Sequence, residues 1–300
     1  MRLSNLAASL LGVLSATIVF AAAGDANASQ PTRPYAGIPG DQAEFVETPD
    51  YMVSVLSSGS APTLIWQTLE HSERTECSSC IPLVAALLYD ANAKNREIAA
   101  WWLRRRMFGV YGPGEVYQQT LNTLASDPSA VRRADAASAL GEFLEIAGSP
   151  ALATAIKSDT DPGTRAAAAS ALGRLNDDGA GALSVAFGDT DPNVRLAAVQ
   201  AAGRVNSFVD VVTTAKLVGD SSALVRRQAV MLLDEMNATD SVAAVLALAQ
   251  KDSDSEVRLS ACHALGTFGD SSVVPALTAI ANSDANQQVR DQAHIATLRL

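Results

Sequence analysis

The chain has 300 residues and a formal net charge of −10, and 48% of its residues are hydrophobic against 18% that are charged. This composition excludes an intrinsically disordered chain, and the acidic balance excludes a nucleic-acid-binding protein, which needs a cationic surface. Three cysteines are too few for a disulfide-stapled scaffold, whereas the 55 alanines favour helices, because alanine loses the least entropy on entering one.

Residues 1–28 have the pattern of an export signal peptide. Arg2 precedes an apolar run over residues 6–23, and Ala26-Asn27-Ala28 has the small-x-small form of a cleavage site. We therefore expect an exported protein, periplasmic or secreted, with no membrane span once the signal is removed. The alternative is an uncleaved anchor, because the apolar run is close to the shortest that spans a bilayer.

Residues 29–62 differ in composition from the rest of the chain. They hold five of the twelve prolines and show little helical periodicity. This composition predicts a proline-rich extended arm or linker, with one short helix around residues 50–56. Disorder after the cleavage site and an arm docked on the folded part are both compatible with the sequence.

Residues 63–126 are expected to form an atypical helical cap at the start of the folded part. Cys77 and Cys80 are separated by two serines and precede an apolar helix predicted over residues 81–89. Three interpretations remain open: a structural disulfide, a redox-active pair at a helix start, and a zinc site with His71 that would lack a fourth ligand. Haem attachment is excluded, because Ile81 rather than histidine follows Cys80.

The same cap gathers aromatic and basic side chains. Seven aromatic residues lie between residues 66 and 117. Five cations form a local cluster: Lys94, Arg96, Arg104, Arg105 and Arg106. On a helix, Trp102 belongs to the apolar face and Trp101 points away from it. Either the arm covers Trp101, or Trp101 binds an acidic protein partner together with Arg104, Arg105 and Arg106, since tryptophan and arginine are frequent in interface hot spots.

The sequence repeats itself over residues 127–300, and the first arginine of the pattern lies in the cap. The repeating arginines, spaced by 37, 32, 30, 31, 32 and 32 residues, are Arg96, Arg133, Arg165, Arg195, Arg226, Arg258 and Arg290. Alanine stands three positions after each of them. Glycine stands eight positions after four of them, at Gly141, Gly173, Gly203 and Gly266. Such a period predicts helix hairpins of about 31 residues, which bury their apolar faces only by stacking.

Local signals agree with this period. Aspartate followed by proline, as at Asp161 and Asp191, predicts a helix start, because aspartate caps free N–H groups and proline fits the first turn. The small alanine lets a neighbouring helix approach, and we expect the glycine to stop the helix in a left-handed conformation. The pattern predicts an all-α fold, an α-solenoid of about six to seven antiparallel helix hairpins.

The segments Asp191–Gly203 and Ser255–Gly266 resemble HEAT repeats, and most of all the short variety named after phycobilisome lyase subunits. The resemblance extends over about residues 80–300. It implies a ladder of aspartate and arginine between neighbouring repeats, expected here from three pairs: Asp161 with Arg165, Asp191 with Arg195, and Asp254 with Arg258. The fold serves many unrelated roles, so the resemblance alone indicates no single function.

The sequence carries no motif of a known catalytic centre. None of the three histidines precedes a glutamate, and P-loop, G-x-S-x-G and zinc-protease motifs are absent from the sequence. We expect no cofactor and no metal. The first hypothesis is an exported, non-enzymatic scaffold that binds another protein, and no nucleic acid, on its concave face. The second is an extracytoplasmic thiol–disulfide or redox-sensing protein that uses Cys77 and Cys80, and the third is a lyase or carrier for a chromophore or cofactor.

Overall fold

The computed structural model describes residues 47–107, 114–176 and 180–300. The predicted export signal, and the predicted arm up to residue 46, lie outside these residues. The described residues contain sixteen α-helices and no strand. These are α1 (Pro49–Ser57), α2 (Pro62–His71), α3 (Ile81–Leu87), α4 (Ala93–Met107), α5 (Glu115–Ser126), α6 (Ala130–Phe143), α7 (Ser149–Ser158), α8 (Pro162–Leu175), α9 (Ala180–Ala186), α10 (Pro192–Ala202), α11 (Val211–Lys216), α12 (Ala223–Glu235), α13 (Val242–Lys251), α14 (Ser255–Phe268), α15 (Val274–Ser283) and α16 (Gln287–Arg299).

Short 3-10 turns precede or follow several of these helices. They are η3 (Ser78–Cys80), η4 (Ile146–Gly148), η5 (Leu217–Gly219), η6 (Thr239–Ser241) and η7 (Ser271–Val273). No helix in the described ranges is long and apolar enough to cross a membrane.

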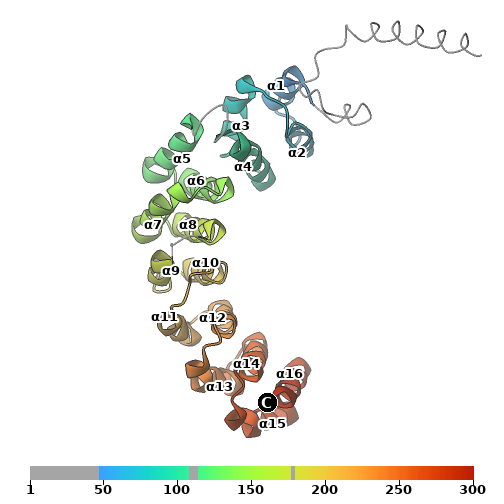
Figure 1. Ribbon diagram of the computed structural model, residues 1–300, viewed down its shortest axis with the longest axis vertical. Helices are drawn as coiled ribbons and strands as arrows, with labels where there is room; N and C mark the ends of the chain where they lie inside the picture. Colours follow the sequence, from blue (N-terminus) through green and yellow to red (C-terminus); the bar gives the residue numbers. More distant parts are fainter. Residues whose placement is uncertain (1–46, 108–113, 177–179) are drawn as a thin grey trace, which may run out of the picture.

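Consecutive helices form antiparallel pairs that stack side by side into a curved array (Figure 1). The odd-numbered helices α5, α7, α9, α11 and α13 follow the outer, convex side, and the even-numbered helices α6, α8, α10, α12 and α14 follow the inner, concave side. Each inner helix packs on the next inner helix and on the outer helix that precedes it in the chain, for example α8 on α10 and on α7. The molecule is the all-α solenoid that the sequence predicts.

The recurring glycines have a different role from the predicted one. Gly173 lies inside α8, and a Cβ atom built on it would be 2.7 Å from the Cα atom of Ala201 on α10. Gly141 and Gly266 face the next inner helix in the same way. The prediction of a left-handed stop at these glycines is therefore wrong. They let two helices touch, and the left-handed residues follow them at helix ends, for example Leu144 and Asn176.

The folded part begins within the predicted arm. Residues 49–57, placed by the sequence in an extended arm with one short helix, are entirely helical as α1. Its side chains Met52 and Val55 are buried in the same core cluster as Val84 of α3. The Thr75 hydroxyl also donates a hydrogen bond to the backbone oxygen of Glu47, at 2.8 Å. The short helix predicted around residues 50–56 is therefore confirmed as α1, which packs with α2 at the start of the array.

Candidate functional site

A ladder of ion pairs joins successive repeats. Arg195 of α10 illustrates one rung: its Nε donates to Oδ2 of Asp220 at 2.6 Å, and its second terminal nitrogen donates to Oδ1 of the same residue at 2.8 Å. Its first terminal nitrogen donates to the backbone oxygen of Asp189, at 2.8 Å. The same two-pronged pairing forms five rungs: Arg133–Asp159, Arg165–Asp189, Arg195–Asp220, Arg226–Asp252 and Arg258–Asp284.

The carboxylates of the ladder are not the ones that the resemblance suggests. Asp161, Asp191 and Asp254 cap their own helices instead; Oδ2 of Asp161, for example, accepts a hydrogen bond from the backbone nitrogen of Thr164 at 2.7 Å. The ladder that the resemblance implies is therefore confirmed with Arg165, Arg195 and Arg258, whereas the assignment of these three aspartates to it is wrong. Each carboxylate is occupied by free N–H groups of the helix that it starts, whereas the rung is made by an aspartate two residues earlier in the chain.

The rung carboxylates are stabilised in their charged form. At Asp159 and Asp284 the hydrogen bonds from Arg133 and Arg258 are the largest cause that lowers the pKa. At Asp189, Asp220 and Asp252 burial alone would raise the pKa, but the hydrogen bonds from the arginine and from a backbone N–H outweigh burial and lower it. The ladder is therefore an electrostatic link that requires ionised aspartates.

The ladder is interrupted between α4 and α6. Arg96 of α4 pairs with Asp135 of α6, with Nε 3.0 Å from Oδ1, and not with Asp127. Asp127 instead accepts a hydrogen bond from Nε of Arg132, at 3.0 Å. In addition, Arg104 of α4 occupies the position that Gly141 and Gly173 occupy in α6 and α8. Helix α4 therefore lacks the glycine that brings those helices into close contact with the next inner helix. We call residues 49–107 (α1–α4) the N-terminal module and residues 115–300 (α5–α16) the regular stack.

Within the predicted basic cluster, Arg106 is buried, whereas Arg104 and Arg105 lie nearer the surface. The second terminal nitrogen of Arg106 donates to the backbone oxygens of Ser72, Glu73 and Thr75 at 2.9–3.1 Å. Its guanidinium carbon lies 3.4 Å from the ring centroid of Trp102. Arg106 therefore holds the N-terminal module together, and its predicted role in binding a partner is wrong, because its guanidinium is buried on backbone oxygens.

The other members of this predicted site lie nearer the surface. Trp101 is half-buried against the core, Arg104 is half-buried, and exposed Arg105 pairs with Glu73. Trp101, which follows its ladder arginine by five positions, begins a series on the inner helices. The residues at the same position of later repeats are Ser138, Ser170, Gln200, Met231, His263 and Ile295. We call these seven residues the concave series.

The concave series faces away from the outer helices. Most of its members are exposed, and because the outer helices cover the opposite side of the inner helices, exposed residues in the middle of an inner helix face the concave side. Polar pairs cross this face between neighbouring helices, for example Arg174 with Glu142 at 2.8 Å. A shallow pocket of about 310 Å³ lies beside it, and burial raises the pKa of both Asp135 and Glu142 there.

Cys77 and Cys80 form a disulfide across the turn η3, with their Cα atoms 5.2 Å apart. Both residues are buried, and the sulfur of Cys80 lies 4.0 Å from the sulfur of Met52 on α1. The described residues contain no group of three or more histidine, cysteine or acidic side chains that could hold a metal ion. The remaining thiol, Cys262, is buried in α14, and burial raises its pKa to about 12, which makes it unreactive.

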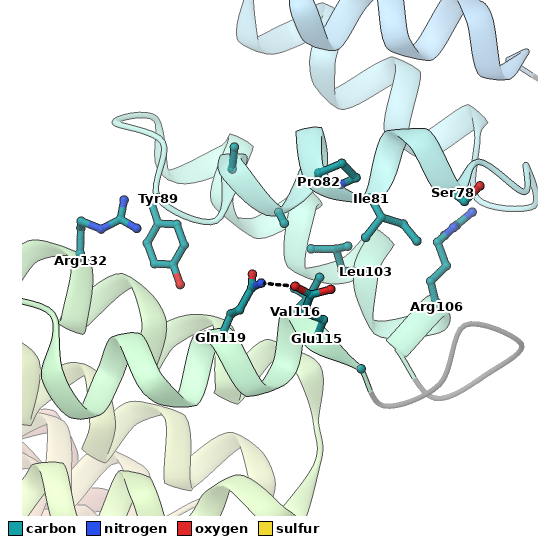
Figure 2. A pocket seen from close by; sticks show the side chains of 13 residues that line it. Ser78, Ile81, Pro82, Tyr89, Leu103, Arg106, Glu115, Val116, Gln119 and Arg132 are labelled. Atoms are coloured by element: carbon teal, nitrogen blue, oxygen red, sulfur yellow. Dashed lines mark hydrogen bonds between the residues drawn. The ribbon is translucent and has the colours of Figure 1, made fainter.

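The interruption of the ladder coincides with a crevice (Figure 2) that has a volume of about 680 Å³. Its walls are α3 and α5, and Leu103 of α4 lies between them. Arg132 and Tyr89 form one end, where the guanidinium carbon lies 4.1 Å from the ring centroid. Ser78 and Arg106 form the other end.

Sequence reasoning missed both the rung carboxylates and this crevice. A signal for the first was present, because an aspartate stands six positions before each repeating arginine: Asp90, Asp127, Asp159, Asp189, Asp220, Asp252 and Asp284. Aspartate is present at this position before every repeating arginine, whereas the residue at the capping position two residues later varies. The crevice had only an indirect signal, the spacing of 37 residues where the later spacings are 30–32.

Stacked antiparallel helix pairs, joined by an arginine–aspartate ladder, define an α-solenoid repeat protein. The family model described as HEAT repeats matches residues 117–185, 149–215 and 211–298. The chain therefore belongs to the HEAT-repeat family. No curated protein matches this sequence.

Solved structures are similar in fold over most of the chain. The Escherichia coli protein YibA is 18% identical with a TM-score of 0.59, over 90% of this chain and 100% of that one. Importin beta is 14% identical with a TM-score of 0.58, over 84% of this chain and 46% of that one. Kap95p, in a structure of its binding to RanGDP, is 13% identical with a TM-score of 0.53, over 88% of this chain and 44% of that one. At these identities the likeness concerns the fold alone.

Proposed function

We propose that this protein is an exported, non-enzymatic scaffold that binds another protein along its concave face. The observation that carries the proposal is the contrast between two positions of the repeat. Three positions after the ladder arginine every repeat has alanine, as stacking requires, whereas five positions after it the concave series has residues as different as tryptophan, glutamine and methionine. Stacking does not constrain these positions, so their side chains are free to contact a partner.

The exposure of apolar side chains on the inner helices supports the same proposal. Met231 and Ile295 of the concave series are 39% and 43% exposed, and Leu224 on α12 is 61% exposed. Large apolar side chains that remain in water are typical of protein-binding surfaces, and the outer helices also carry some, such as Val185 of α9 and Val212 of α11. Kap95p, which binds RanGDP, is an example of a similar fold that binds a protein. The net charge of −10 favours partners that carry basic patches.

Export rests on residues 1–28 and has its own test. Cleavage after Ala28 would leave Ser29 as the first residue of the mature protein. N-terminal sequencing of protein purified from the native cell envelope or culture medium measures this directly. A chain that keeps its first 28 residues and fractionates with membranes would favour the uncleaved anchor.

Site-specific photo-crosslinking in the native cells tests the binding face. A benzophenone amino acid replaces Gln200 or Met231 on the inner helices, and Thr154 on α7 is the matched control, because it is exposed on an outer helix. We expect an adduct of one defined mass from the inner positions and none from Thr154. Equal adducts from both sides, or adducts from Thr154 alone, would contradict the proposal.

A further inference from the structure

The crevice between α3 and α5 lies where the ladder is interrupted. Next along the array α5 packs on α7 and α7 packs on α9, whereas α3 and α5 share no comparable contact. Between α3 and α5 the space of about 680 Å³ replaces this contact. Pockets that bind small molecules have volumes of roughly 300–1,000 Å³. The space therefore has the size of a ligand site, and it is lined by residues outside the concave series.

The middle of the crevice is apolar. Its walls carry Ile81, Pro82, Ala85 and Ala86 of α3 and Val116 of α5, and Leu103 lies behind them. The two alanines leave room between the helices, and none of these side chains offers a hydrogen bond. A flexible alkyl chain fits such a lining, because it gains free energy from burial without needing polar partners.

The ends of the crevice are cationic. At one end Arg132 lies beside Tyr89, and its Nε is taken by Asp127, so that the terminal nitrogens of the guanidinium remain as donors. At the other end Arg106 is held by backbone oxygens. The opposing charge is Glu115 on the α5 wall, whose carboxylate accepts a hydrogen bond from the side-chain amide of Gln119 at 3.0 Å.

We infer that this crevice binds a fatty carboxylate, with its alkyl chain between α3 and α5 and its carboxylate on Arg132. Arg132 is suited to this role because its side chain is 47% exposed and its planar guanidinium is already oriented by Tyr89 and Asp127. A carboxylate accepts two parallel hydrogen bonds from such a guanidinium. Asp127 occupies only Nε of Arg132, and the terminal nitrogens can donate but not accept, so an anionic head group is favoured there over a cationic one.

Binding of the fluorescent fatty acid cis-parinarate to the purified mature protein tests the site. Ala86→Phe fills the crevice from an exposed position of α3, and Ala247→Phe is the matched control at an exposed alanine of α13. We expect saturable binding to the wild type and to Ala247→Phe, and binding at least about tenfold weaker to Ala86→Phe. Equal binding to all three proteins would overturn the inference, because it would place the probe elsewhere.

Displacement of the probe tests the head group. Dodecanoate should displace cis-parinarate at a lower concentration than dodecyltrimethylammonium or the neutral 1-decanol. Arg132→Gln should weaken dodecanoate binding by roughly tenfold and leave 1-decanol unchanged, since one charge-assisted pair is lost. If the cationic or the neutral compound displaces the probe as well as dodecanoate, the carboxylate assignment fails, even where Ala86→Phe abolishes binding. Neither result depends on a protein partner at the concave face.

Discussion

The regular stack and the N-terminal module hold their neighbouring helices together by different contacts. In the stack a rung such as Arg195–Asp220 recurs between successive pairs, and three of the contacts between inner helices use a glycine, as Gly173 does on Ala201. In the module the links are individual. Trp102 donates from its ring nitrogen to the hydroxyl of Ser72 at 3.0 Å, and Arg106 ties the same segment through backbone oxygens.

This difference affects the kind of binding site that each region offers. The regular stack also leaves space between repeats, since a crevice of about 580 Å³ lies between α5 and α7 beside the rung Arg133–Asp159. At the junction the rung between Arg96 and Asp127 is absent, and a crevice of about 680 Å³ opens there. The junction crevice therefore differs from those of the stack in its lining, which combines apolar side chains of α3 with Arg132, while the repetition creates a long surface.

Acid should destabilise the regular stack more than the N-terminal module. This is the largest expected effect, because acid acts on five rungs at once. The folded-state pKa values of Asp159, Asp189, Asp220, Asp252 and Asp284 are lowered. A lowered pKa contributes stability above the unfolded value of about 3.9, and this stability is lost as the pH falls through the folded value. Circular dichroism should therefore report loss of stack helix in this acid range.

The N-terminal module and its junction should respond differently. Burial raises the pKa values of Asp135 and Glu142 at the junction, so their contribution to stability increases as the pH falls through those values. The three tryptophans all lie in the module, so that their fluorescence reports it alone. Fluorescence that changes at the same pH as the helix signal would contradict independent responses of the two regions.

Removal of one rung should cost about 3 kcal/mol. Arg195→Met leaves Asp220 without its partner, and their side chains are only 12% and 6% exposed, so that a largely buried charge is left uncompensated. Arg174→Met is the matched control, because Arg174 is 48% exposed and its pair with Glu142 should contribute less than about 1 kcal/mol. Urea denaturation followed by circular dichroism measures both, and equal losses would contradict a special role of the ladder.

Disturbing the close contact between α8 and α10 should lower the free energy of unfolding by about 2 kcal/mol. Gly173→Ala places a Cβ atom 2.7 Å from the Cα atom of Ala201, so that α8 and α10 must move apart. Gly219→Ala makes the same chemical change at a glycine with no atom within 4 Å of the added carbon. A thermal melt should show a lower midpoint for the first variant alone.

Loss of the disulfide should be the smallest effect, at most about 2 kcal/mol, because the ring that it closes is short. Cys77→Ser with Cys80→Ser should therefore lower the stability reported by tryptophan fluorescence slightly and leave the stack unchanged. Alkylation and mass spectrometry across a redox series give the potential of the pair. A structural disulfide should stay oxidised until strongly reducing conditions, whereas exchange at a mild potential would favour the redox hypothesis.

Much of the fold could be predicted, and less of the candidate site. Alanine three positions after each arginine and a period near 31 residues suffice for a helical stack, because both are local and periodic properties of the sequence. The role of Gly173 could not be predicted in this way, since glycine at a helix end and glycine at a helix contact look alike in a sequence. Arg106 looked like a surface cation for the same reason, because the backbone oxygens that bury it belong to a segment more than 30 residues away.

The sequence by itself determined the repeat, its helices and their order, because helix starts and apolar spacing depend on residues a few positions apart. Tertiary structure alone decided which aspartate meets each arginine, which glycine admits a neighbouring helix, and where the stack opens between α3 and α5. These outcomes depend on how one repeat is positioned on the next. That position follows from the combined packing of two helix pairs, which no single repeat contains.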